Sequence, residues 1–217
     1  MIIDLKMTGK KVVIVGGGAE AQKRVRSLLG QKCDIIVIAD SVDPGIKKLA
    51  SAGKLVLRKK RIQGIGFISE LNPDILVAAT DDSRLNKKIT DAAKRRKILA
   101  YRADSPEDSD FANPATIEIG GIVQIAIFTG GRSPAMSKKI RVKSEKALRK
   151  VITPEDIVRI KVQDSARRIA KNAIHSQKER KKYLETIMTD ARIDQLIKDG
   201  QLRKAQRRAA AMLGDRK

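Results

Sequence analysis

The chain has 217 residues, of which 41% are hydrophobic and only 2% are aromatic. This length allows one or two domains, and the apolar content is enough for an aliphatic core, which excludes a disordered chain. No apolar run approaches the roughly 18 residues that suggest a membrane helix. The N-terminal stretch lacks the basic and apolar regions of a signal peptide. We therefore expect a cytoplasmic protein that does not enter a membrane.

The formal net charge is +22, and it is unevenly distributed. Residues 138–217 contain 24 Lys and Arg against 10 Asp and Glu, whereas residues 1–137 contain 23 against 15. A positive field of this size attracts nucleic acid, anionic membranes or acidic small molecules. The single cysteine, Cys33, excludes an intrachain disulfide, and with one histidine in the chain a Cys/His metal cluster is excluded as well.

Short apolar runs alternate with helical patterns over the first part of the chain. This alternation is typical of βαβ units, because parallel neighbouring strands need a crossover connection. The fold class that we predict is α/β, with a Rossmann-type parallel sheet. The patterns predict strands at 10–15, 33–40, 54–60, 73–82 and 98–104, and helices at 19–30, 43–53 and 82–97.

After about residue 115 the pattern changes. Two β-rich runs flank Gly120 and Gly121, which predicts a hairpin because its tight turn favours residues that accept a positive φ. Basic helices follow, and Ser133 and Thr153 are candidate N-caps, each followed by proline at the first helical position. Further short helices are expected to about Leu213. We predict a nucleotide-binding domain at 1–115, a dimerisation region at 116–152 and a helical domain at 153–217.

The sequence VVIVGGGAEAQKR carries the glycine pattern of a dinucleotide-binding turn. The first glycine permits the tight turn, the second lets the backbone approach a pyrophosphate, and the third position must be small so that helix and strand pack closely. The context supports this interpretation, because the turn follows a strand and begins a helix. A glycine-rich turn without a ligand is the alternative. The predicted cofactor-binding residues of this turn are Gly16, Gly17, Gly18, Ala19 and Ala21.

Asp40 ends the second predicted strand and is the candidate acid for the adenosine ribose. Such an acid is expected about 20 residues after the glycines, and binding to the 2′-hydroxyl would favour NAD over NADP. Asp40 lies about one position late, so an ordinary loop or capping aspartate is the alternative.

Three further stretches follow in order: AATDDSRLN (78–86), RADSPEDSDFANPA (102–115) and TGGRSPAM (129–136). Together with the glycine turn, they resemble the precorrin-2 dehydrogenase family, which includes the N-terminal module of siroheme synthase. The resemblance covers nearly the whole chain and is strongest over residues 10–137.

This resemblance implies a homodimer that oxidises precorrin-2 to sirohydrochlorin with NAD, on the way to siroheme. The family's active-site aspartate matches Asp104, and its nucleotide loop matches Thr80, Asp81 and Asp82. Its Gly-Gly-x-Ser-Pro motif matches Gly130, Gly131, Ser133 and Pro134. Some members of the family also insert ferrous iron, and for this chain that activity is left open.

The reaction also needs a base for a proton and cations for the substrate carboxylates. His175 lies in a basic helical stretch without partners that could orient it, so a carboxylate is the remaining ordinary base. We expect burial to raise the pKa of Asp104 toward that use, although the residue could instead orient the macrocycle or stabilise a turn. Candidate substrate-binding residues are Arg102, Gly131, Arg132, Ser133 and Lys138, with Lys139 and Arg141 as further cations.

Two other functions stay open at this point. Nucleic-acid binding is favoured by the charge, but the interspersed acids and the scarcity of aromatic residues argue against it. A nucleotide-sensing domain of the type that gates potassium transport would share the glycine turn, but we would not expect a GGRSP junction or a basic helical tail in it. The acidic run Ser105–Asp110 departs from expectation, because extra acids suit a substrate with eight carboxylates poorly.

Overall fold

The computed structural model describes residues 2–214, which form two compact units. The N-terminal unit comprises Met1–Asn113 with Gly130–Arg132, and the C-terminal unit comprises Pro114–Thr129 with Ser133–Lys217. Apart from Gly130–Arg132, the predicted dimerisation region and helical domain both fall in the C-terminal unit, so the division into three domains stays a prediction.

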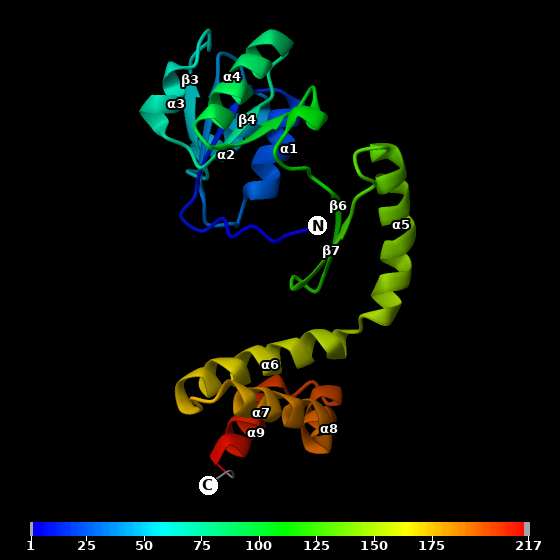
Figure 1. Cartoon of the computed structure of the whole chain (residues 1–217). Helices are drawn as coiled ribbons and strands as arrows, with labels where there is room; N and C mark the ends of the chain where they lie inside the picture. Colours follow the sequence, from blue (N-terminus) through cyan, green and yellow to red (C-terminus); the bar gives the residue numbers. More distant parts are fainter. Residues whose placement is uncertain (1, 215–217) are drawn as a thin grey trace. The chain divides into compact units, whose positions relative to one another are not determined.

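The N-terminal unit is built on a five-stranded parallel sheet with the strand order β3-β2-β1-β4-β5 (Figure 1). The order reverses direction between β1 and β4, and in open α/β sheets ligands bind beyond the carboxyl ends of the strands at such a point. The sheet confirms the predicted Rossmann-type fold class. Its elements are β1 (Lys11–Val15), α1 (Ala19–Leu28), β2 (Asp34–Ala39), α2 (Pro44–Ser51), β3 (Val56–Lys59), α3 (Gly66–Leu71), β4 (Ile75–Ala78), α4 (Ser83–Arg95) and β5 (Leu99–Arg102), followed by the 3₁₀ turn η1 (Pro106–Asp108).

Successive side chains of β1 point to opposite faces of the sheet, and both faces are covered by helices. Val13 and Val15 belong to a core cluster that includes residues of α3 and α4. Val12 and Ile14 belong to a second cluster that includes residues of α1 and α2. All four side chains are at most 1% exposed, which explains why this strand reads as a continuous apolar run.

Two elements, α3 and η1, were not predicted from the sequence. Helix α3 has only six residues and follows a stretch rich in glycine and polar residues, so it shows too few turns for a helical period to be visible. It ends at Asn72, whose φ of 43° places it in the left-handed region. The short turn η1 begins at Pro106, in the acidic run after β5.

The C-terminal unit begins with the predicted hairpin of β6 (Ala115–Ile119) and β7 (Val123–Ile127), which pair antiparallel. Gly120 and Gly121 have φ values of 62° and 69°, as the tight turn requires. The hairpin packs against α5 (Pro134–Val151), and Ile157 closes this small core.

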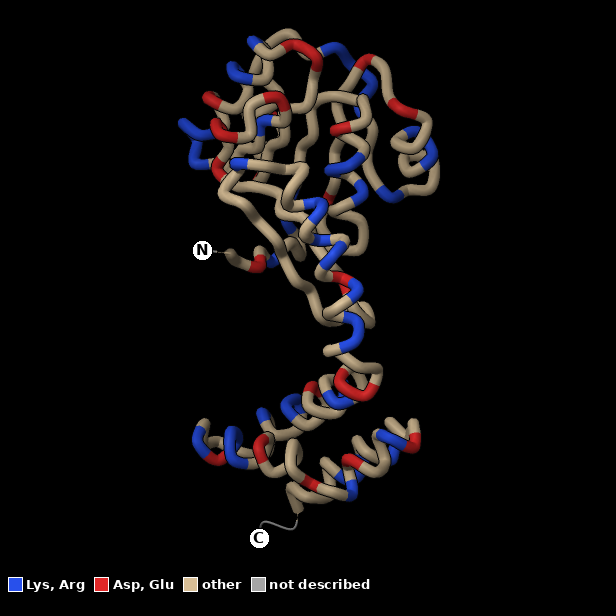
Figure 2. The backbone as a smooth tube through the Cα atoms, turned by 90° about the vertical axis from the view of Figure 1, so that its right-hand side faces the viewer, with Lys and Arg blue, Asp and Glu red and all other residues tan. Residues whose placement is uncertain are grey.

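The helical part of this unit contains α6 (Pro154–Ala173), α7 (Gln177–Thr189), α8 (Ala191–Lys198) and α9 (Leu202–Gly214). The predicted caps are confirmed, since the side chains of Ser133 and Thr153 accept hydrogen bonds from the first turns of α5 and α6. The fully buried Tyr183 anchors α7 on α9 through a 2.6 Å hydrogen bond from its hydroxyl to the Ala209 carbonyl. Lys and Arg alternate with Asp and Glu along these helices (Figure 2). Among the described residues, no helix has the length and apolarity to cross a membrane.

Candidate nucleotide-binding site

A cavity of about 460 Å³ lies at the carboxyl edge of the sheet, where β1 and β4 meet. It is lined by the glycine turn after β1, by the loop after β2 and by the loop after β4. Of the predicted cofactor-binding residues it brings together Gly16, Gly17, Gly18, Asp40, Thr80 and Asp81.

The close approach of three backbone segments makes the first two glycines obligatory. Gly16 has a φ of 122°, and a Cβ atom there would overlap the carbonyl oxygen of Ala79. A Cβ atom on Gly17 would overlap the carbonyl oxygen of Ser41. No larger residue fits at either position without moving β4 or the loop after β2.

Gly18 differs from these two glycines because it faces open space. Its φ is −82°, and a Cβ atom built on it would have no neighbour within 4 Å. Gly18 is the N-cap of α1, and no side chain satisfies the first N–H groups of that helix. Free N–H groups and the positive end of the helix dipole are suited to a pyrophosphate, so the turn fits a dinucleotide.

The remaining two alanines of the pattern do not line the cavity. Ala21 is fully buried in the cluster that contains Val12 and Ile14, as the small third position of the pattern requires. Ala19 is exposed at the first position of α1, where its N–H group is one of the unsatisfied donors.

Asp40 lies in the loop after β2 and lines the cavity with an exposed side chain. Its Oδ1 accepts a 2.8 Å hydrogen bond from the Ser41 N–H, so part of its bonding capacity is used locally. Lys60 and Arg61, which follow β3, line the same cavity. The sequence analysis did not single out these two cations, because a basic pair after a short strand looks like any other solvated charge.

Asn86 connects the cavity to the end of β5, and sequence analysis gave it no role. The residue is fully buried on the first turn of α4. Its Oδ1 accepts hydrogen bonds from the N–H and the hydroxyl of Thr80, at 3.1 and 2.6 Å. Its Nδ2 donates to the Thr80 carbonyl and to Oδ1 of Asp104, both at 2.8 Å. One amide thus fixes Thr80, which lines the cavity, relative to Asp104.

Asp104 is held by Arg102 as well as by Asn86. The guanidinium donates from Nε to Oδ1 at 3.2 Å and from Nη2 to Oδ2 at 2.8 Å. Burial raises the pKa of Asp104, but hydrogen bonds from Arg102, Ser83 and Asn86 outweigh it and leave that pKa below its ordinary value. The expectation of a raised pKa was therefore wrong. That expectation took burial into account but not the cation Arg102, which lies two residues before Asp104 at the end of β5.

Arg102 was predicted to bind substrate, but the structure gives its side chain other partners. The side chain is only 8% exposed, and it pairs with Asp104 and, through Nη1, with Asp108 at 2.8 Å. Its Nη2 also donates to the hydroxyl of Ser83 at 2.9 Å. This geometry favours a role for Arg102 in positioning Asp104.

The acidic run after β5 is largely used to fold its own loop. Asp108 pairs with Arg102, and Asp110 accepts a 2.8 Å hydrogen bond from the Ala100 N–H and pairs with Lys94 at 3.5 Å. These carboxylates already have donors and cations. They therefore repel an anionic substrate less than the sequence suggested.

The junction before α5 is ordered by local hydrogen bonds. Ser133 caps the helix by accepting from the Met136 N–H at 3.2 Å, and its own N–H and carbonyl bond to the Thr129 hydroxyl. Gly131, Arg132 and Lys138 are exposed. That these three residues and Ser133 contact the substrate stays a prediction.

A metal centre has no support in residues 2–214, where no group of three or more His, Cys, Asp and Glu side chains is arranged to hold an ion. His175 is exposed between α6 and α7, as expected for a surface histidine. Whether the chain inserts iron stays open.

Comparison with known proteins agrees with this site. The family described as "Putative NAD(P)-binding" matches residues 3–115, which is more than half of the chain and contains the whole sheet and the glycine turn. The chain belongs to this NAD(P)-binding family.

Relatives and solved structures narrow the comparison further. The chain is 27% identical over 212 residues to siroheme synthase 3 of Aeromonas hydrophila, and 34% identical over 146 residues to siroheme synthase of Methylococcus capsulatus. These alignments cover 97% and 66% of this chain but only 43% and 29% of the relatives. The chain thus spans less than half the length of these curated relatives.

A solved structure titled "SirC, precorrin-2 dehydrogenase" has a similar fold. Its TM-score is 0.71 at 24% identity, and the match covers 97% of this chain and 99% of that one. This match shows a shared fold, and the likeness to the siroheme synthases bears out the resemblance that the four ordered motifs predicted.

We predict that Gly18→Asp leaves the fold intact but weakens NAD binding about 100-fold or more, because like charges brought together cost several kcal/mol. Isothermal titration calorimetry with NAD⁺ measures the affinity, and thermal unfolding reports the fold. Gly16→Ala should instead lower the thermal midpoint, since its Cβ meets the Ala79 carbonyl. Unchanged affinity in Gly18→Asp would show that the pyrophosphate binds elsewhere.

Proposed function

We propose that this protein oxidises precorrin-2 to sirohydrochlorin with NAD as the hydride acceptor. The observation that carries the proposal is the placement of Asp104. Two hydrogen bonds of Asn86 fix this carboxylate relative to a nucleotide-binding loop. The likeness to siroheme synthases and to the precorrin-2 dehydrogenase fold supports the same substrate. We further propose that the protein acts in the cytoplasm.

The main steps of this reaction can be assigned to residues of the chain. The α1 N-terminus and the glycine turn would bind the nucleotide, whose bound form supplies the hydride acceptor. Loss of a hydride leaves positive charge on the macrocycle, and a fixed, ionised carboxylate stabilises such charge. The lowered pKa of Asp104 keeps it ionised near neutral pH and makes it a weak base. The geometry therefore favours charge stabilisation by Asp104 and release of the accompanying proton to solvent.

We expect Asp104→Asn to bind NAD⁺ normally but to lose roughly 100-fold in turnover, in the range measured for the loss of one electrostatic stabiliser. Asp104→Ala should lose at least as much. Anaerobic assays with precorrin-2 that follow NADH absorbance give the rate.

Asp108→Asn is the matched control, because Asp108 pairs with the same arginine at 2.8 Å but is 53% exposed. Its turnover should stay within about threefold, because the exposed Asp108 carboxylate is screened by solvent and Arg102 keeps its bonds to Asp104. Full activity of Asp104→Asn would remove Asp104 from the mechanism, and equal losses in both variants would mean that only the loop structure matters.

We propose that Asp40 selects NAD by accepting a hydrogen bond from the ribose 2′-hydroxyl. We expect Asp40→Asn to lose roughly tenfold in NAD affinity, the size of one charged hydrogen bond, and to gain affinity for NADP, whose 2′-phosphate the carboxylate repels. Calorimetric titration with both nucleotides tests this. If Asp40 only accepts the hydrogen bond from the Ser41 N–H, the affinities for NAD and NADP will change together or not at all.

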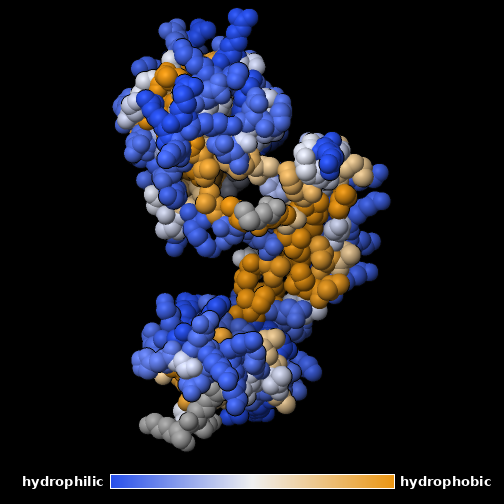
Figure 3. Space-filling view, viewed as in Figure 1, coloured by the Kyte–Doolittle hydropathy of each residue, from blue (hydrophilic) through white to orange (hydrophobic). Residues whose placement is uncertain are grey.

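We also propose a homodimer formed through the hairpin and α5. Figure 3 shows a broad apolar surface over these elements. A two-stranded sheet is only marginally stable alone, and apolar patches of this kind mark interaction sites. The exposed apolar side chains are Ile122, Phe128, Met136, Ile140, Val142 and Val151.

Ile140→Asp should convert the dimer to a monomer, because a carboxylate would be buried without a partner at the interface. Light scattering coupled to size-exclusion chromatography measures the mass. Ile169→Asp on α6 is the control, since both isoleucines are 38% exposed and only Ile140 lies on α5. A wild-type monomer, or equal behaviour of the two variants, would contradict this interface.

A further inference from the structure

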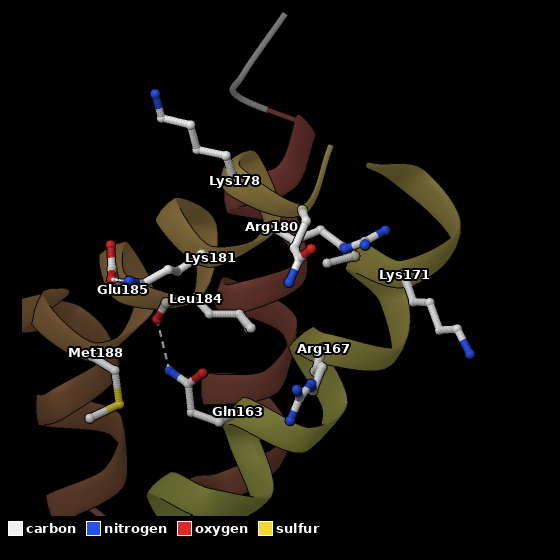
Figure 4. Close-up of a pocket in the computed structure, with 11 residues that line it drawn as sticks. Gln163, Arg167, Lys171, Lys178, Arg180, Lys181, Leu184, Glu185 and Met188 are labelled. Carbon is white, nitrogen blue, oxygen red and sulfur yellow. Dashed lines mark hydrogen bonds and ion pairs between the residues drawn. The ribbon is translucent and has the colours of Figure 1, made fainter. Parts of the chain in front are cut away.

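A second cavity lies between α6 and α7 of the C-terminal unit, and the proposed reaction assigns it no role. It measures about 1070 Å³, slightly above the usual range for small-molecule sites. Figure 4 shows Gln163 and Arg167 on α6 facing Leu184 and Met188 on α7. We call this cavity the helical groove.

The lining of the helical groove is strongly cationic, with five Lys and Arg residues and one acid, Glu185. A lining with this excess of one charge attracts an anion that presents several negative groups. The five cations are Arg167, Lys171, Lys178, Arg180 and Lys181.

Two of the five cations already have partners. Lys181 pairs with Glu185 at 3.7 Å, and Arg180 donates to the Ile174 carbonyl at 2.9 Å. In the described part of the chain the other three have no ion pair. Lys171 and Lys178 extend from the rim of the groove (Figure 4), and their exposed, flexible stems let them turn toward a bound anion.

The floor between these cations is apolar. Ala170 is fully buried, Leu184 is half-buried, and Met188 is 47% exposed although it is a large apolar residue. A 3.0 Å hydrogen bond from Gln163 Nε2 to the Leu184 carbonyl ties the two helices together across the floor. The groove therefore combines a fixed apolar surface with a ring of mobile positive charge.

We propose that the helical groove binds a polycarboxylate tetrapyrrole, with the macrocycle over the apolar floor and its carboxylates on the rim cations. The polyanion class follows from the charge, and the choice of a tetrapyrrole rests on the proposed function. Nucleic acid fits less well, because no aromatic side chain in the lining offers a stacking surface for a base. The groove would be a second site for substrate or product, distinct from the nucleotide cavity.

The test measures the binding of uroporphyrin, a stable macrocycle with eight carboxylates, to the full-length protein without nucleotide. The fluorescence of uroporphyrin reports the binding. Arg167→Gln/Lys178→Gln removes one cation from each wall of the groove. Lys161→Gln/Lys182→Gln removes one exposed cation from each of the same helices outside the groove. The net charge changes equally, and glutamine is a good helix former.

We expect the groove variant to lose roughly tenfold in affinity, the combined effect of two exposed ion pairs, and the control to change less than twofold. Equal losses in both variants, no loss in either, or no uroporphyrin binding by the wild type would overturn the proposal. A DNA duplex provides the test for the other kind of ligand. If the duplex displaces uroporphyrin and also binds the groove variant tenfold more weakly than the wild type, the groove would be assigned to nucleic acid instead.

Turnover separates this proposal from the proposed function. The groove variant should keep its kcat with precorrin-2. A raised KM would identify the substrate as the occupant, and weaker inhibition by added sirohydrochlorin would identify the product. Uroporphyrin binding that depends on the groove, without any dehydrogenation by the wild type, would support the groove and refute the proposed reaction.

Discussion

The nucleotide site depends on the close approach of β1 and β4 at Gly16. A parallel sheet places the carboxyl ends of these strands side by side, and the missing Cβ of Gly16 lets the turn pass against the Ala79 carbonyl. Any side chain there would push the two loops apart. The cavity, the orientation of α1 and the position of Thr80 all follow from this contact, because each is set by where the chain leaves β1 or β4.

Asn86 connects the nucleotide site to Asp104, the residue proposed to act in the reaction. A buried amide must satisfy its hydrogen bonds, and this one does so by joining the β4 loop to Asp104. Arg102 donates to both oxygens of the same carboxylate. A carboxylate with two such donors is held in one orientation, and its lowered pKa favours the ionised form. This suits a group that stabilises developing positive charge better than one that must take up a proton.

The positive charge of the chain has more than one use. Arg102, Lys94 and several helical cations pair with nearby acids, so the charge of these residues is used within the fold and is not free to bind nucleic acid. The cations that remain without ion pairs in the helical groove surround an apolar floor. Charge together with an apolar surface selects an amphipathic anion, whereas charge alone would not distinguish among polyanions.

The sequence by itself determined the backbone elements and the glycine turn. Their signals are local: the apolar runs of β1 and β4, the caps at Ser133 and Thr153, and the paired glycines of the hairpin. Helix α3 was missed because six residues carry too little periodicity.

Only the tertiary structure decided the state of Asp104, the role of Asn86 and the existence of the helical groove. The pKa of Asp104 depends on how burial balances against donors from α4 and the end of β5. The groove depends on how two helices face one another. Such properties arise from the distances between side chains of different elements once these have packed, which local periodicity and propensity do not encode.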